Sequence, residues 1–137
     1  MAKGDTLHNL GIATKEKNRD IEEAIACWQQ LAQDSSYSID MRTQALCKSG
    51  ITEEQIGNRD AALTDYYCAM KEEVIPTNNQ RWHDMAAFRA AALLEKEQNW
   101  RDAIHIYQAI EAEKGPRATE ATNHMSKLRL ENFLWDE

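Results

Sequence analysis

The histidines are the side chains best suited to bind a metal ion or to move a proton, so their spacing is the first feature to test. They are His8, His83, His105 and His124. No two of them lie three or four positions apart, which is the spacing that places two ligands on one helix face. A metal site would therefore need the fold to assemble it from distant residues, and we expect none.

His83 is followed directly by Asp84, a pair that resembles a general base and the carboxylate that orients it. Successive residues of a helix point about 100° apart, so we expect these side chains not to share the hydrogen bond of such a dyad. The sequence also lacks a glycine-rich phosphate-binding loop. We therefore predict no catalytic residue, no cofactor and no enzyme activity.

The cysteines Cys27, Cys47 and Cys68 offer a second potential chemistry. Their number is odd and none is spaced as CxxC, so the sequence indicates neither a disulfide framework nor a zinc site. We expect them to be small core side chains of a protein in a reducing compartment.

Charge and hydropathy limit the partners. The chain has 23 acidic and 16 basic residues and a net charge of −7, which repels nucleic acids and anionic lipid headgroups. No apolar run is long enough for membrane insertion, and the first residues lack the apolar stretch of a signal peptide. We predict a cytoplasmic protein, or a periplasmic one if the chain is a trimmed piece of a longer protein.

The elements that would position these side chains are helices. Gly (5) and Pro (2) are scarce in the 137 residues, and good helix formers dominate. A chain of this length with 42% hydrophobic residues fits one domain, residues 1–137.

Three similar segments indicate an internal repeat. Residues 18–20, 58–60 and 99–102 each begin with Asn, end with Asp and separate two helical patterns. Asn tolerates the left-handed conformation that closes a helix, and Asp accepts hydrogen bonds from the free amides of the next one. Each segment therefore predicts the turn of a helical hairpin.

The same spacing of small, aromatic and apolar residues follows each turn. The sets are Ala24, Trp28 and Leu31; Ala62, Tyr66 and Ala69; and Ala103, Tyr107 and Ile110. Offsets of four and three place each set on one helix face, where the small residue allows close approach. The preceding helices carry Leu7-x-x-Leu10-Gly11, Leu46-x-x-Ser49-Gly50 and Ala87-x-x-Ala90-Ala91, and we expect the last residue of each to face the small residue of the partner helix.

These patterns resemble the tetratricopeptide repeat, which uses Leu-Gly and then Ala, an aromatic residue and Ala at these offsets. The resemblance implies an all-α, right-handed superhelix (an α-solenoid) of about three hairpins, at residues 5–34, 37–74 and 77–114. The repeats recur at roughly forty residues instead of about 34, so residues 38–57 and 78–98 should form long first helices, similar to extended bacterial repeats. In the third repeat Ala91 replaces the glycine.

A final helix, residues 116–135, should cap the stack, because Gly115 stops a helix and Pro116 is tolerated at the first position of the next. Its face of Ala118, Ala121, Met125 and Leu128 suits a cap. Its end is apolar on several sides, at Leu130, Phe133, Leu134 and Trp135. These residues either pack back onto the third hairpin or form a docking surface for a partner or a second copy.

In tetratricopeptide arrays the first helices line the inner groove, and that register selects groove residues here. They are His8, Ile12, Lys15, Gln44, Cys47, Ile51, Glu54, Gln55, Met85, Phe88, Arg89, Ala92, Glu95 and Lys96. The set suits an extended peptide or a partner helix with apolar anchors and does not suit a clamp for an acidic C-terminus. Alternatively, Ile51, Met85 and Phe88 are ordinary core residues of long helices.

The resemblance therefore implies a protein interaction scaffold or adaptor that binds a peptide or protein. Two alternatives remain open: a structural subunit that self-associates into a homo-oligomer through the apolar C-terminal helix, and a secretion-type chaperone.

Overall fold

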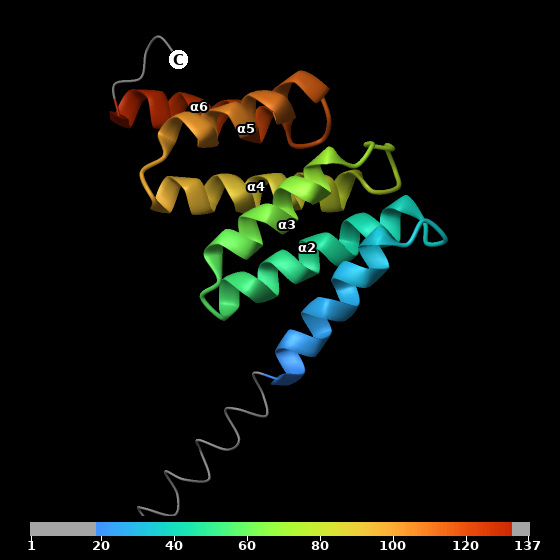
Figure 1. Cartoon of the computed structure of the whole chain (residues 1–137). Coiled ribbons are helices and arrows are strands. Elements are labelled where there is room, and N and C mark those ends of the chain that lie inside the picture. The colour runs from blue at the N-terminus through green and yellow to red at the C-terminus, as the bar shows by residue number, and fades with distance from the viewer. Residues whose placement is uncertain (1–18, 133–137) are drawn as a thin grey trace, which may run out of the picture.

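The computed structural model describes residues 19–132 as a series of helices joined by short loops (Figure 1). A first helix covers residues 19–33 and is followed by α2 (Ile39–Gln55), α3 (Arg59–Lys71), α4 (Gln80–Lys96), α5 (Trp100–Glu113) and α6 (Ala118–Asn132). The described part of the chain contains no strand. The prediction of an all-helical fold is confirmed. Several predicted features lie outside the described residues: the start of the turn at 18, and His8, Ile12, Lys15, Phe133, Leu134 and Trp135.

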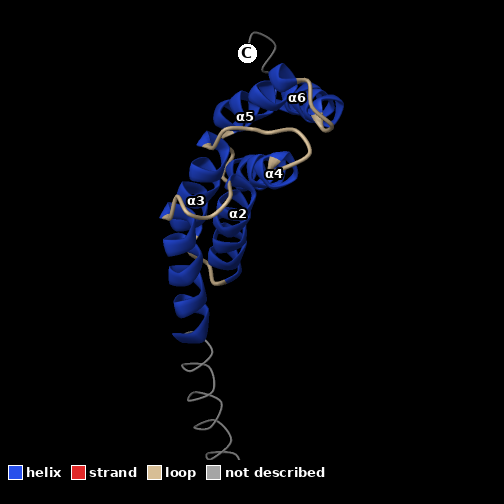
Figure 2. Cartoon of the chain, turned by 90° about the vertical axis from the view of Figure 1, so that its right-hand side faces the viewer, coloured by secondary structure: helices blue, strands red, loops and turns tan. Residues whose placement is uncertain are grey.

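The helices stack in chain order. Each of α2 to α5 packs against the helix that follows it, and α2 also contacts α4. Helix 19–33 joins the same core through Ala32, with Trp28 and Leu31 partly buried against it. Figures 1 and 2 show the hairpins α2–α3 and α4–α5 one above the other, with α6 lying on α5 at the C-terminal end.

The long first helices are confirmed, and their starts have local causes. Ser38 caps α2 by accepting a hydrogen bond from the Met41 amide at 3.2 Å. Before α4, the fully buried Asn79 donates to Thr43 Oγ1 (3.1 Å) and to the Glu73 carbonyl (2.7 Å), and it accepts from the Ile75 amide. This one side chain fixes the α3–α4 loop onto α2.

The hairpin turns before α3 and α5 lie where the sequence predicts them, but the roles of their residues are shifted. The left-handed residues are Gly57 (φ 82°) and Gln98 (φ 62°), each one position before the asparagine. The amides of Asn58 and Asn99 close the preceding helices by donating to the carbonyls five residues back. The predicted left-handed role of the asparagines is therefore wrong. Asp102 accepts a hydrogen bond at the start of α5, but the donor is the Asn99 side chain, at 2.8 Å.

The turn before α6 differs in the same way. Lys114 (φ 53°) is the left-handed residue, and Pro116 precedes the helix start at Ala118 by two positions. A Cβ at Gly115 would meet the amide end of the Gln80 side chain, which would have to move to make room. The face of α6 that carries Ala121, Met125 and Leu128 is buried, as expected for a cap.

A buried tyrosine occupies the centre of each of the hairpins α2–α3 and α4–α5. Tyr66 and Tyr107 are 0% and 1% exposed. Their hydroxyls donate to Glu54 (2.5 Å) and Glu95 (2.7 Å), so both the ring and its hydrogen bond recur 41 positions apart. At these residues the structure therefore repeats after 41 positions, in agreement with the repeat of roughly forty residues expected from the sequence.

The small residue of α2, Gly50, lies against this ring. A Cβ added to Gly50 would lie 2.5 Å from Tyr66 Cε1. In the third repeat the same position holds Ala91, which is fully buried. The α2–α3 pair therefore approaches more closely at this point than an alanine allows.

The two hairpins differ in one buried layer. In α2–α3 the Ser49 hydroxyl lies 2.5 Å from Asp65 Oδ2 and 3.3 Å from Glu53 Oε1, and Gln29 of the first helix donates to Asp65 at 3.3 Å. A shift of 41 positions replaces this cluster by apolar residues, Ala90, Leu94 and Ile106. Burial, together with the hydrogen bond and charge of Asp65, raises the pKa of Glu53 to about 8.

We expect Gly50→Ala to destabilise the fold by roughly 1–3 kcal/mol, because the added methyl group must displace a fully buried tyrosine ring. Thermal and urea unfolding measure the effect. Ala91→Gly, at the matching position of the third repeat, should cost only about 1 kcal/mol through helix propensity. Equal losses in the two variants would contradict a tighter contact at Gly50.

Glu53→Gln should stabilise the protein above neutral pH. The folded-state pKa is raised from 4.5 to about 8, so the contribution of Glu53 is complete below pH 4.5 and is lost as the pH rises through 8. Glutamine carries no such penalty, and the melting temperature at pH 8 should rise by about 3–8 °C, with little change at pH 4.5. The exposed Glu131→Gln is the control; a pH-independent effect of Glu53→Gln would disprove the linkage.

Candidate functional site

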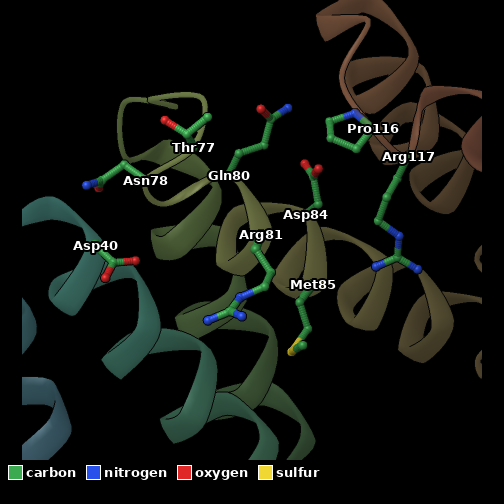
Figure 3. Close-up of a pocket in the computed structure, with 9 residues that line it drawn as sticks. All are labelled: Asp40, Thr77, Asn78, Gln80, Arg81, Asp84, Met85, Pro116 and Arg117. Carbon is green, nitrogen blue, oxygen red and sulfur yellow. The ribbon is translucent and has the colours of Figure 1, made fainter.

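Two hollows lie along α4 and share two lining residues. The larger, of about 700 Å³, lies at the start of α4 and is lined by Asp40, Thr77, Asn78, Gln80, Arg81, Asp84, Met85, Pro116 and Arg117 (Figure 3). The second, of about 360 Å³, is lined by Glu54, Met85, Phe88, Arg89, Ala92, Lys96 and Arg117. Because Met85 and Arg117 belong to both, the hollows follow each other along the helix. We call their combined lining the α4 face.

The α4 face contains much of the groove set that the sequence predicts from the first helices. Glu54, Met85, Phe88, Arg89, Ala92 and Lys96 all line the second hollow. Of the other predicted residues, Gln44, Ile51 and Glu95 are half-buried, Gln55 is exposed and Cys47 is fully buried; none of them lines these two hollows. Ile51 and Met85 also pack against the core. The repeat register therefore predicted most residues that line the second hollow, but only Met85 among those that line the first.

Phe88 is a core side chain, which agrees with the alternative interpretation of that residue. It is 9% exposed and meets the rings of Tyr107 and His124 edge-on, at 5.5 and 5.8 Å between centroids. The guanidinium of Arg117 lies 3.7 Å above its ring. Phe88 therefore supports the floor of the hollow and offers little surface to a partner.

Arg117 lines both hollows and is among the residues that sequence reasoning missed. Its guanidinium donates twice to Glu120, at 2.8 Å each, and this pairing raises its pKa. In Figure 3, Arg81 and Arg117 lie on either side of Met85. The sequence offered no signal for this placement, because it depends on how the α5–α6 loop returns to α4.

Cations outnumber anions along the α4 face. Arg81, Arg89, Lys96 and Arg117 line it, against Asp40, Glu54 and Asp84. Arg81 also lies 4.7 Å from the ring centroid of Trp82. The face is therefore slightly basic on a chain with a net charge of −7.

His83 and Asp84 do share a hydrogen bond, so the expectation that they would not was wrong. His83 Nδ1 lies 3.2 Å from Asp84 Oδ1, because side-chain torsions offset the angle between neighbours on a helix. His83 Nε2 lies 3.2 Å from the Met70 carbonyl and 3.6 Å from Glu113 Oε1. Burial lowers the pKa of His83, but Asp84 and Glu113 outweigh it and the pKa is raised.

The cysteines are free, and only one of them is buried as predicted. Cys47 is fully buried, and desolvation raises the pKa of its thiol to about 11, so it is a poor nucleophile. Cys27 and Cys68 are exposed, which corrects the expectation that all three belong to the core.

One large apolar side chain, Leu130, is exposed in the last turn of α6. Leu130 is 62% exposed, so it does not pack back onto the third hairpin. The rest of the predicted apolar set lies beyond the described residues.

Comparison with family models, curated proteins and solved structures gave no match for this chain. Among the described helices, none has the length and apolar character needed to cross a membrane. The structure therefore defines the chain by its fold, an all-helical stack of hairpins with a hollowed face along α4.

Phe88→Ala should destabilise the fold by about 3–5 kcal/mol, because it removes a buried ring that contacts Tyr107, His124 and Arg117. Arg89→Ala, at the next and exposed position, should change the free energy of unfolding by less than about 0.5 kcal/mol. Denaturant unfolding followed by circular dichroism compares them. Near-wild-type stability of Phe88→Ala would show that Phe88 is a surface residue of the hollow.

Proposed function

We propose that this protein is a tetratricopeptide-like adaptor that binds a peptide or a helix of a partner protein along the α4 face. The observation that carries the proposal is the pair of hollows that share Met85 and Arg117 and contain groove residues expected from the repeat register. Peptide-binding helical repeats use this kind of preformed surface.

The chemistry of the face suits a protein segment better than a small molecule. Half-buried Met85 offers a flexible apolar contact between the two hollows, and charged groups surround it. The floor is held by buried Phe88 beneath Arg117, so binding would order few side chains. A secretion-type chaperone is a narrower form of the same function.

A second candidate function is self-association through the end of α6. Leu130 is the most exposed large apolar side chain of the described residues. Such a side chain on the last described helix of a stack supports a seam to a second copy.

A capture experiment separates the two candidates. We expect Arg89→Glu with Lys96→Glu to reduce partner capture from cell lysate at least tenfold, because both exposed cations line the second hollow. Lys71→Glu with Lys127→Glu changes the charge equally at exposed positions outside both hollows and should have no effect.

Captured proteins are identified by mass spectrometry, and a chain truncated after Arg129, which removes Leu130, is tested in parallel. Equal losses in the two charge variants would argue against the α4 face. Capture of the chain alone, lost on truncation, would favour self-association instead.

A further inference from the structure

The cluster of His83, Asp84 and Glu113 has more acceptors than one neutral imidazole can satisfy. Its ligand-type atoms lie within 4.8 Å of one another. Asp84 Oδ1 faces Nδ1, so the proton of a neutral ring would be placed there. The lone pair of Nε2 would then face two further acceptors, the Met70 carbonyl and the Glu113 carboxylate.

The second hairpin, α2–α3, has an ion pair at the matching position. A shift of 41 positions carries His83 onto Arg42 and Glu113 onto Glu72, and these two form an ion pair at 3.9 Å. Arginine brings a permanent positive charge to the open end of its hairpin. A neutral histidine does not, so the matching place in the third hairpin holds a cation only when His83 binds a proton or a metal ion.

The distances fit a divalent metal ion. Tetrahedral bonds of about 2.0–2.1 Å separate neighbouring ligand atoms by about 3.3–3.4 Å. Nε2 of His83 lies 3.6 Å from Glu113 Oε1 and 3.2 Å from the Met70 oxygen. Asp84 on the opposite ring nitrogen is the carboxylate that commonly fixes a metal-binding histidine. The side chains of His83 and Asp84 are 5% and 3% exposed, whereas that of Glu113 is 31% exposed and opens the cluster to solvent.

We propose that His83 Nε2 and Glu113 bind a divalent metal ion of the zinc class at the open end of the third hairpin. The Met70 carbonyl is a third oxygen on the same side, and Asp84 is a positioning residue. Nitrogen and oxygen ligands of this kind suit Zn²⁺ and its spectroscopic substitute Co²⁺. The ion would tie the end of α3 to α4 and α5, as Arg42 ties α2 to the end of α3.

The test uses the full chain with Cys27→Ser and Cys68→Ser, which removes the exposed thiols, after treatment with a chelator. Zn²⁺ should raise the melting temperature, and Co²⁺ should give the visible absorption of a tetrahedral site. Glu113→Gln should weaken Co²⁺ binding at least tenfold. Glu72→Gln, the matching change in the second hairpin, should leave it unchanged.

Two further variants keep the result interpretable. His83→Arg places an arginine where the second hairpin has Arg42. This variant should fold, and its melting temperature should not change with Zn²⁺. Asp84→Asn should weaken Co²⁺ binding about tenfold while the tetrahedral spectrum is retained.

No Co²⁺ absorption at millimolar metal, or equal affinity in wild type and Glu113→Gln, would overturn the proposal and leave a proton as the cation on His83. A sulfur-to-cobalt charge-transfer band would overturn it as well, because it would place the metal on Cys47.

Discussion

The arrangement depends first on the buried tyrosine of each hairpin. Tyr66 and Tyr107 fill the space between two helices and donate to a carboxylate on the partner helix. The ring sets how far apart the two helices lie, and the hydrogen bond sets their register along the axis. Because the same pair of interactions recurs 41 positions later, the hairpin α4–α5 repeats α2–α3, and the stack follows from joining two similar units with a short loop. Gly50 shows how closely the first unit is packed, since even one methyl group would overlap the ring.

The hollowed face is a consequence of that stacking. Contact between α2 and α4 brings Glu54 beside the middle of α4, and the loop before α6 returns Arg117 onto Phe88. Neither hollow belongs to one hairpin. Each needs residues from at least two units. A partner that binds there would contact several repeats at once and would also stabilise their packing.

The sequence predicted the parts of this structure that depend on local spacing. Hairpin turns near Asn58 and Asn99, the long helices α2 and α4, and the buried tyrosines all follow from periodicity and capping, which involve neighbours in the chain. The sequence did not predict two of the side-chain contacts described above. The contact of Arg117 with Phe88 depends on the path of a loop, and the bond between His83 and Asp84 depends on side-chain torsions. Phe88 was ambiguous for a related reason: an apolar residue on a first helix can face either a groove or the core, and α6 decides which.

The buried polar layer of the second hairpin has a consequence for how such a chain can change. Asp65 receives a hydrogen bond from Gln29 of the preceding helix, whereas the matching positions of the third hairpin are apolar. The buried layer of each hairpin therefore suits the unit that lies beside it in this chain. Exchanging the two units, duplicating one or deleting one would press carboxylates against an apolar surface, at a cost of several kcal/mol. The repeats look alike in outline, yet a copy of α2–α3 placed after α5 would lack the Gln29 partner of Asp65.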